Sequence, residues 1–455
     1  MPEYKFKKDF LRTPKGTRDI LPHDFLYWQF VQQKAEEIGR AYGFQPIRTP
    51  HIEKTELFTA TLGESSDVVE KQMYTFRTRG GDSLVLRPEG TIPIIRAYFE
   101  HGMHTWPQPV MLYYSGSFFR HESPQRGRFR EFGQFGCEII GEEAGIADAL
   151  VIWVISLIFQ EIGIKSYLVH VNTLGDKECR PEYRRDLVAY YRRKVNSLCK
   201  DCHRRLKTNP LRLLDCKNPN CIDLKAEAPQ MVNYACSSCK AHFKTVLEFL
   251  DELGIPYYLN PYLVRGLDYY SRTVFEFFRG DKNPSSLGES KGEDQNTDKK
   301  DLALASGGRY DYLAEALGEK RVAGVGGSIG LDRVVEELRA QKAKPFKEKA
   351  PSIFLIQLGP QAQRKSFLLF EDLRKAKFNI AQPFSKDGLR SQLQLADKRG
   401  ATWVLIVGQK EALDAKIIVR DMASGAQETI LQNKLLDYLK KKISTRGGSA
   451  LGGKK

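Results

Sequence analysis

The residues LVRGLDYYSRTVFEF at 263–277 place an arginine and two adjacent tyrosines directly before a segment with strand character. The end of this stretch, 273–278, is rich in β-branched and aromatic residues, and 257–259 is similar, so both predict strands. The guanidinium of Arg265 suits a phosphate, because its planar fork donates two parallel hydrogen bonds. Taken alone, however, an arginine is more often part of a surface ion pair.

The flanking segments predict an antiparallel sheet with helices. Residues 110–141 alternate apolar stretches with an Arg-rich middle, HESPQRGRFRE, which predicts two antiparallel strands joined by a long basic loop. Residues 25–42 carry apolar side chains at helical spacing, and the apolar run at 149–159 is too short to cross a bilayer, so it predicts a buried helix. Residues 322–340 predict a strand followed by a helix. We therefore expect an α+β domain over 1–340, built on an antiparallel sheet.

Two further regions have a different composition. Residues 176–250 are rich in cysteine, lysine and arginine and lose the strand signal, which predicts an inserted, mostly helical module. After a Lys- and Pro-rich linker at 341–350, residues 351–440 alternate strand and helix patterns, as expected for a small α/β domain with a mostly parallel sheet. Residues 441–455 predict a disordered basic tail. The polar stretch 279–301 predicts a flexible surface loop.

The net charge favours a polyanionic partner. Lys and Arg number 71 and Asp and Glu 56, a difference of +15, which attracts nucleic acids or anionic membranes. The first residues, MPEYKFKKDF, lack the apolar core of a secretory signal, and six of the eight cysteines crowd into 199–239 rather than forming a chain-wide disulfide framework. These features predict a cytoplasmic protein without a membrane segment.

No phosphate-binding loop of the G-x-x-x-x-G-K-[ST] type is present, and GVGGSIG at 324–330 does not fit G-x-G-x-x-G. If ATP binds, cationic side chains must hold its phosphates. Arg120 at the end of a predicted strand, Arg265, and Arg333 at the start of a predicted helix are the candidates.

Several motifs together resemble a known family. Gly43-Phe44-x-x-Ile47-x-x-Pro50, Phe119-Arg120-x-Glu122 with Arg128-x-x-x-Phe132, and Gly327-x-x-Gly330-Leu331-Asp332-Arg333 resemble motifs 1, 2 and 3 of class II aminoacyl-tRNA synthetases. The segments 263–277 and ALASGGRYDYLAEALG at 303–318 resemble signatures of histidyl-tRNA synthetases, as do TPKGTRDILP at 13–22 and RPEGT at 87–91. The resemblance runs from about residue 10 to about residue 430.

The resemblance implies an activity: ATP-dependent ligation of L-histidine to tRNA(His) through a histidyl adenylate, with release of AMP and pyrophosphate. It implies ATP contacts at Arg120, Glu122 and Arg333, with Arg265 beside the substrate carboxylate and the α-phosphate. The remaining residues would bind histidine: the α-amino group through Glu89, Thr91 and Gln134, the imidazole through Glu138 and Tyr270, and the rest of the pocket through Gly90, Tyr269 and Tyr310.

Charge and hydrogen bonding explain why these residue types suit the reaction. Negative charge builds on the phosphate oxygens as the histidine carboxylate attacks, so fixed cations and Mg²⁺ lower the barrier. An imidazole N–H needs an acceptor, which Glu138 supplies, and apolar amino acids would leave such groups unpaired.

The resemblance also implies RNA contacts and a homodimer. In the loop after Arg120, Gln125, Arg126 and Arg128 would meet the acceptor end of the tRNA, although Ser123 stands where the family pattern has a second basic residue. The C-terminal domain resembles an anticodon-binding domain, in which Lys386, Arg390, Lys398 and Arg399 face either RNA or solvent. Motif 1 would build the dimer interface.

The cysteines leave two interpretations open. Cys199-x-x-Cys202 and Cys236-x-x-Cys239 have the paired spacing of a tetrahedral zinc site, and Cys216 and Cys221 could add ligands. The alternative is reduced structural cysteines in a helical insertion, because the family does not require zinc.

Three other functions compete with the leading one. A catalytically inactive paralogue serving as a regulatory subunit of a histidine-biosynthetic transferase would typically lack the RGLDYY residues and the C-terminal domain, and both are present. An RNA-binding or stress-sensing module would bind tRNA without ATP–pyrophosphate exchange. A proline or threonine synthetase would share the three motifs but not GLDYY with GGRYD.

Overall fold

The computed structural model describes residues 11–63, 66–280, 302–343, 352–383 and 388–447, and the side chains of this range up to residue 442. The chain divides into two compact units, Met1–Phe346 and Lys347–Lys455, and each is described by itself. The boundary falls inside the linker expected at 341–350. The loop predicted at 279–301 lies almost entirely outside the described residues.

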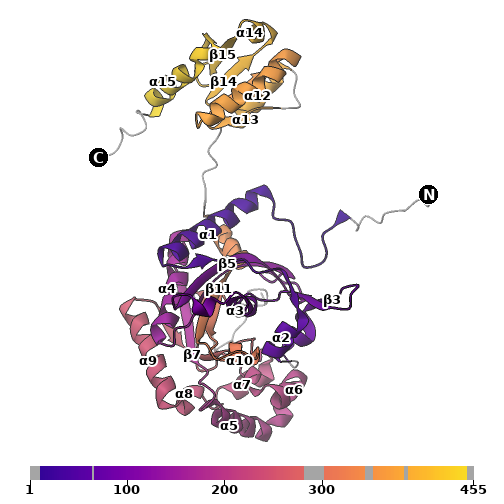
Figure 1. The fold of residues 1–455 in the computed structure, drawn as a ribbon, viewed down its shortest axis with the longest axis vertical. Coiled ribbons are helices and arrows are strands. Elements are labelled where there is room, and N and C mark those ends of the chain that lie inside the picture. Colours follow the sequence, from indigo (N-terminus) through magenta and orange to yellow (C-terminus); the bar gives the residue numbers. More distant parts are fainter. Residues whose placement is uncertain (1–10, 64–65, 281–301, 344–351, 384–387, 448–455) are drawn as a thin grey trace, which may run out of the picture. The chain divides into compact units, whose positions relative to one another are not determined.

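The larger unit is built on an eight-stranded sheet with the order β1-β5-β6-β11-β10-β9-β7-β8 (Figure 1). Neighbouring strands from β5 to β7 in this order are antiparallel, whereas β1 on β5 and β8 on β7 are parallel pairs. The strands are β1 (Gln45–Pro46), β5 (Val110–Phe119), β6 (Glu131–Ile140), β7 (Tyr167–Thr173), β8 (Tyr257–Leu259), β9 (Ser271–Arg279), β10 (Ala305–Arg309) and β11 (Gly324–Gly330). The antiparallel sheet predicted for this domain is confirmed.

One face of this sheet is covered by apolar helices. Helix α4 (Gly145–Ile162) buries side chains on most of its surface and packs with α1 (Pro22–Ala41), α9 (Ser237–Glu252) and β11, while α11 (Leu331–Ala340) packs on β6. By length and composition α4 could cross a membrane, but 67% of its apolar window is buried inside the protein. The predicted buried helix at 149–162 therefore belongs to the core.

The other face of the sheet carries smaller elements and a second apolar core. Helix α3 (Thr91–Glu100) lies there with α2 (Thr55–Leu62) and a three-stranded sheet of order β2-β4-β3. Its strands are β2 (Ile52–Lys54), β3 (Tyr74–Arg77) and β4 (Ser83–Leu86). The short helical segments of this unit are η2 (Val68–Gln72), η3 (Met103–Thr105) and α10 (Leu313–Ala316).

The chain between β7 and β8 forms the predicted helical module, at the lower end of this unit in Figure 1. Its buried aromatic and aliphatic side chains, such as Tyr183, Leu187 and Tyr191, extend the core around α2 and α3. Its helices are α5 (Arg180–Arg193), η4 (Val195–Ser197), α6 (Lys200–Thr208), η5 (Pro210–Leu213), α7 (Pro219–Lys225), α8 (Met231–Tyr234) and α9. Helix α9 packs against α4, so the C-terminal end of the module is fixed to the helical layer on the eight-stranded sheet.

The smaller unit is an α/β domain with a five-stranded sheet of order β13-β12-β14-β15-β16. Strands β12, β13 and β14 are parallel, as predicted, but β15 and β16 are antiparallel, and β16 was not foreseen because its QETIL sequence is mostly exposed. The elements are β12 (Ile353–Gln357), α12 (Pro360–Lys375), β13 (Ile380–Ala381), α13 (Leu389–Lys398), β14 (Trp403–Val407), α14 (Gln409–Leu413), β15 (Lys416–Asp421), β16 (Gln427–Leu431), η7 (Gln432–Lys434) and α15 (Leu435–Gly447). The prediction of a disordered tail from residue 441 is wrong at its start, because α15 continues to Gly447.

Candidate active site

A buried carboxylate at the start of α3 forms one wall of the site. Both oxygens of Glu89 accept backbone hydrogen bonds from the first turn of the helix, from Thr91 at 3.0 Å and Ile92 at 2.7 Å, and Oε2 also accepts one from the Tyr269 hydroxyl at 3.1 Å. Burial raises the pKa of Glu89, against the effect of these donors. The helix N-terminus compensates for part of the cost of burying a negative charge.

A second buried carboxylate, that of Glu138, lies on strand β6. Glu138 on β6 accepts hydrogen bonds from the Thr91 hydroxyl at 2.8 Å and the Tyr310 hydroxyl at 2.6 Å. Burial, with the charge of Glu89, raises its pKa to about 8, although the two hydroxyls act in the opposite direction. At neutral pH this group is therefore held as a neutral acid that becomes charged easily if it receives a further N–H donor.

Glycines in β11 make room for these side chains. A Cβ on Gly326 would lie 1.7 Å from Oε2 of Glu138, and one on Gly324 would lie 2.2 Å from the ring of Tyr310. The run GVGGSIG is therefore a strand packed against Glu138 and Tyr310 and not a nucleotide-binding loop, since a side chain at Gly324 or Gly326 would displace one of them.

Arg265 is held above the same sheet by an ion pair. Its guanidinium contacts the carboxylate of Glu276 on β9, donates to the Ser306 hydroxyl of β10 at 2.9 Å, and lies 5.5 Å from the centre of the Tyr270 ring. Burial raises the pKa of Glu276, whereas the charge of Arg265 acts to lower it. Glu276 and Ser306 were not identified from sequence, although both lie within the signature segments 263–277 and 303–318.

The other two predicted phosphate-binding arginines come from different elements. Arg120 at the end of β5 donates through Nε to the carbonyl of Pro88 at 2.8 Å, next to Glu89. Arg333 in α11 donates to the carbonyls of Gly127 at 3.0 Å and Ala303 at 2.6 Å. Burial and the charge of Arg128 lower the pKa of Arg333 to about 10, so it remains a cation at neutral pH.

The loop between β5 and β6 presents the residues predicted to meet RNA. Arg126 is exposed and lies 3.5 Å from Glu336, while Arg128 lies 3.5 Å from Glu122. Gln125 and Arg128 form an isolated bridge that closes the loop. Arg130, not predicted, donates to the carbonyl of Lys15 at 3.3 Å and so ties the loop to the TPKGTRD segment.

Gln134 and Tyr270, both expected to contact histidine, come from different segments, and within the described residues no hydrogen bond joins either side chain to Glu138. Gln134 on β6 lies between Gly116 and Gly330 of the flanking strands. Tyr270 is buried and stacks obliquely on Tyr269, with ring centres 4.6 Å apart, but the hydroxyl bonded to Glu138 belongs to Tyr310.

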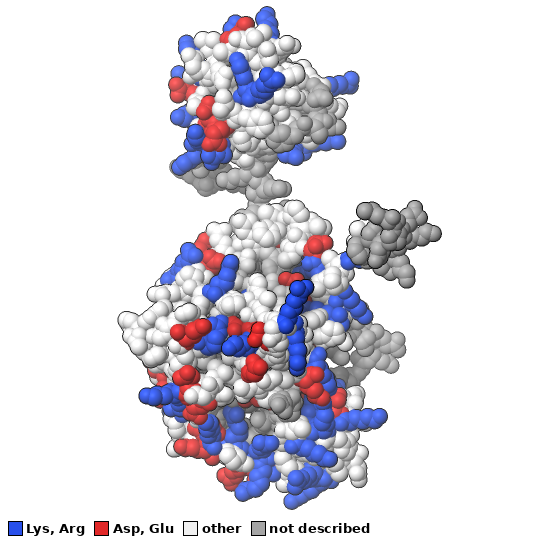
Figure 2. All heavy atoms as spheres, turned by 45° about the vertical axis from the view of Figure 1, so that its right-hand side comes forward, with Lys and Arg blue, Asp and Glu red and all other residues white. Residues whose placement is uncertain are grey.

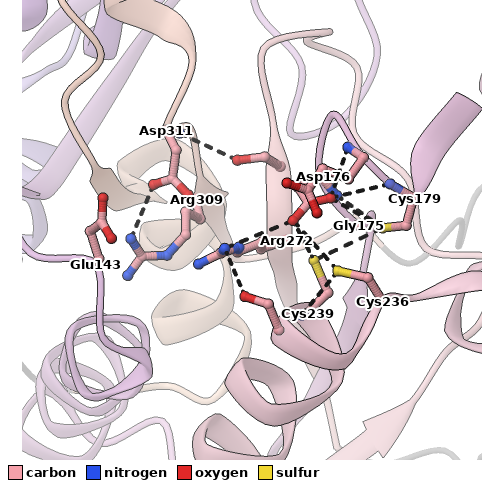
Figure 3. Close-up of polar contacts among 12 residues, drawn as sticks. Glu143, Gly175, Asp176, Cys179, Cys236, Cys239, Arg272, Arg309 and Asp311 are labelled. Atoms are coloured by element: carbon pink, nitrogen blue, oxygen red, sulfur yellow. Dashed lines mark hydrogen bonds and ion pairs between the residues drawn. The ribbon is translucent and has the colours of Figure 1, made fainter.

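A fully buried ion-pair network lies behind Tyr310. Arg309 pairs with Asp148 of α4 and lies 3.1 Å from Asp311, and His242 of α9 lies 3.3 Å from Asp148. Figure 3 shows Arg309 with Asp311. Sequence reasoning missed this network because its residues come from three segments that are far apart in the chain.

The four cysteines considered as one zinc site do not come together. Cys199 and Cys202 cluster with Cys216 and Cys221, whereas Cys236 and Cys239 cluster with Asp176 and Cys179. The single site predicted from the C-x-x-C pairs is therefore wrong, because helix α6 and helix α9 begin in different parts of the module.

An antiparallel sheet with two buried carboxylates and three arginines on neighbouring elements is the arrangement of the catalytic unit of a class II aminoacyl-tRNA synthetase. The histidyl-tRNA synthetase family model matches residues 16–334, and an anticodon binding domain model matches 352–442. The chain belongs to the histidyl-tRNA synthetase family and is an enzyme, a histidine–tRNA ligase.

The similarity extends over nearly the whole chain. A histidine–tRNA ligase of Dehalococcoides mccartyi is 41% identical over 95% of this chain and 100% of the relative, and one of Syntrophotalea carbinolica is 41% identical over 95% and 98%. The apo histidyl-tRNA synthetase of S. aureus shares the structure with a TM-score of 0.75 and 33% identity, covering 94% of this chain and 99% of the other.

Proposed function

We propose that this enzyme attaches L-histidine to tRNA(His) in two steps, forming histidyl adenylate from histidine and ATP and then transferring the histidyl group to the terminal ribose. The observation that carries the proposal is the pair of buried carboxylates, Glu89 and Glu138, joined through Thr91. Histidine offers two nitrogenous groups at its two ends, and these carboxylates can receive one each.

Histidine would be recognised by charge at one end and by hydrogen bonding at the other. Glu89 would bind the α-ammonium with Thr91 and Gln134, and Glu138, fixed by Tyr310, would accept an imidazole N–H. The N–H would favour the charged form of Glu138, whose raised pKa leaves it neutral when the pocket holds no donor. Tyr269 and Tyr270 would close the pocket, and Gly90 leaves space beside Tyr114.

Adenylation needs cations rather than a base, because the attacking histidine carboxylate is already ionised. Arg265 and Arg120 would stabilise the charge that builds at the α-phosphate, and Arg333 would bind the γ-phosphate with Glu122 nearby. Mg²⁺ would arrive bound to the phosphates of ATP. To reach the phosphate, the Arg265 guanidinium would share or release its contact with Glu276.

Transfer would use the loop between β5 and β6 and the smaller unit. Gln125, Arg126 and Arg128 would contact the acceptor end of the tRNA. Arg390 and Lys398 on α13, and Arg399 directly after it, are exposed and could bind the anticodon arm, while Lys386 lies outside the described residues. Lys and Arg also cover much of the helical module on the face drawn in Figure 2. A homodimer built through motif 1 and a cytoplasmic location complete the proposal.

ATP–pyrophosphate exchange with each of the twenty amino acids supplied separately tests this function. Exchange with histidine alone is the expected result, followed by aminoacylation of tRNA(His). No exchange from folded, Mg²⁺-supplied protein would refute the proposal in favour of a regulatory or RNA-binding role.

A further inference from the structure

Two groups of metal-ligating side chains lie in the helical module, away from the substrate pocket. The tip cluster comprises Cys199, Cys202, Cys216 and Cys221, and the neck cluster comprises Asp176, Cys179, Cys236 and Cys239. In each, the four ligand atoms lie within 4.8 Å of one another, and all but Cys199 and Cys236 are buried. Neither cluster contributes a residue to the proposed reaction.

The spacing of the sulfur atoms fits a shared metal. Sγ of Cys199 and Cys216 are 3.8 Å apart, and Sγ of Cys179 and Cys239 are 3.9 Å apart. A disulfide would require about 2.05 Å. Four thiolates at about 2.3 Å from a tetrahedral zinc ion would be separated by about 3.8 Å.

The clusters also contain backbone donors aimed at sulfur. In the tip cluster, the amides of Cys199 and Asn218 donate to Sγ of Cys221 and Cys216 at 3.3 and 3.5 Å. In the neck cluster, the amides of Asp176 and Cys239 donate to Sγ of Cys179 and Cys236 at 3.3 and 3.5 Å. Such donors stabilise thiolates, the form in which cysteine binds metal.

We propose that the helical module holds two structural zinc ions, one bound by the four cysteines of the tip cluster and one by the three cysteines and Asp176 of the neck cluster. Sulfur-rich, four-ligand sites select zinc, and a complete set of four protein ligands leaves no position open for catalysis. Both ions are therefore structural.

The neck cluster joins the two ends of the module. Cys179 follows β7 and Cys239 opens α9, 60 residues later, so one ion closes the whole insertion. Asp176 lies 3.8 Å from Arg272 at the start of β9, and Figure 3 shows these groups together. Arg180, directly after Cys179, donates to the carbonyl of Tyr270 at 2.7 Å. The ion thus fixes the segment that supports a wall of the pocket.

The tip cluster fixes a second contact with the catalytic unit. It ties the start of α6 to the chain that follows η5. Between these points, Arg205 lies 3.0 Å from Asp67, and Asn209 donates to Asp268 of the RGLDYY segment at 2.6 Å. Each ion would thus stabilise a part of the module that contacts the segment carrying Arg265 and Tyr270.

Metal analysis of the full-length protein tests the proposal. The protein is purified with a reducing agent and without chelator, and zinc is measured by inductively coupled plasma mass spectrometry against protein concentration. We expect about two zinc ions per chain. Free-thiol counting with and without a chelator should expose seven additional thiols when metal is removed.

Variants assign each ion to its cluster. C202S and C239S should each retain one ion, and D176A should lose the neck ion while keeping every cysteine. C137S is the matched control, because Cys137 is buried in β6 outside both clusters and should leave two ions. Cobalt substitution should give thiolate-to-metal charge-transfer bands that are weaker in C202S and in C239S.

The wild-type measurement decides the matter even if a variant fails to fold. Fewer than two ions per chain in protein prepared without chelator and resupplied with zinc would overturn the two-site proposal. Cluster thiols that react equally with and without the chelator would overturn it as well.

Discussion

The proposed histidine pocket and the helical module stabilise their buried polar groups in different ways. In the pocket, Glu89 and Glu138 are satisfied by hydroxyls and amides that belong to a rigid sheet and one helix. In the module, the sulfur atoms face one another or Asp176 and accept hydrogen bonds from backbone amides within or next to the same clusters. The carboxylates are thus held by hydrogen bonds within the protein, whereas the two clusters have the ligand sets that the proposed zinc ions would bind.

The largest loss of activity should follow removal of the Arg265 guanidinium. R265A should lower histidine-dependent ATP–pyrophosphate exchange about 10³-fold, because charge building on the α-phosphate loses a fixed donor. R265K is the matched variant and should recover only part of the activity, since it lacks the planar fork. Exchange that remains at the wild-type rate in R265A would refute its role.

Breaking the buried network behind the pocket should destabilise the catalytic unit. R309A leaves Asp148 and Asp311 without their cation and should lower the free energy of unfolding by about 3–5 kcal/mol. Denaturant unfolding measures the change. R279A is a matched control, because Arg279 is half exposed and pairs with Glu337 at 3.3 Å. Equal losses in the two variants would contradict the special role of the buried network.

E138Q should change the pH dependence of stability in a direction set by the raised pKa of Glu138. Glu138 has a folded pKa of about 8 against an ordinary value of 4.5, so the native state binds a proton more tightly than the unfolded state. Its contribution to stability is therefore lost as pH rises from 4.5 through 8. Glutamine stays neutral, so the stability of E138Q relative to the wild type should increase over this range.

The same variant should lose histidine recognition. We expect exchange at saturating ATP to fall about 10²-fold, mainly through a higher KM for histidine, because the neutral amide accepts an imidazole N–H less strongly than a carboxylate. A stability difference that is flat with pH would contradict the raised pKa of Glu138.

Metal removal should act on the module before the pocket. Chelation should make residues 176–250 accessible to limited proteolysis while the smaller unit stays resistant, because a bound metal stabilises only the fold that contains its site. Mass spectrometry of the fragments locates the cuts. Cleavage that is equally fast with and without zinc would remove the contrast between module and pocket.

The smallest effect should come from the loop between β5 and β6. R126A should leave exchange unchanged and raise the KM for tRNA a few-fold, because Arg126 is exposed and outside the histidine pocket. Charging assays at two salt concentrations measure it. A drop in exchange would place Arg126 in the adenylation step instead.

Sequence patterns predicted the regular elements well where periodicity was strong. Helix α1, the β5–β6 hairpin, the buried helix α4 and the strand-to-helix turn at β11 and α11 all appear in the structure. Strand β16 was missed because its exposed residues give no alternating apolar signal. Periodicity reports burial, so an edge strand with little burial leaves no pattern.

The sequence by itself determined the family, the antiparallel catalytic domain and the residue types of the site, because these are carried by local motifs and by composition. Only the tertiary structure decided which groups meet. It paired Arg265 with Glu276, placed the Tyr310 hydroxyl on Glu138, and sorted the cysteines into two clusters. The physical reason is that local spacing fixes neighbours within an element, whereas contacts between distant segments depend on how the sheet and the module pack in three dimensions.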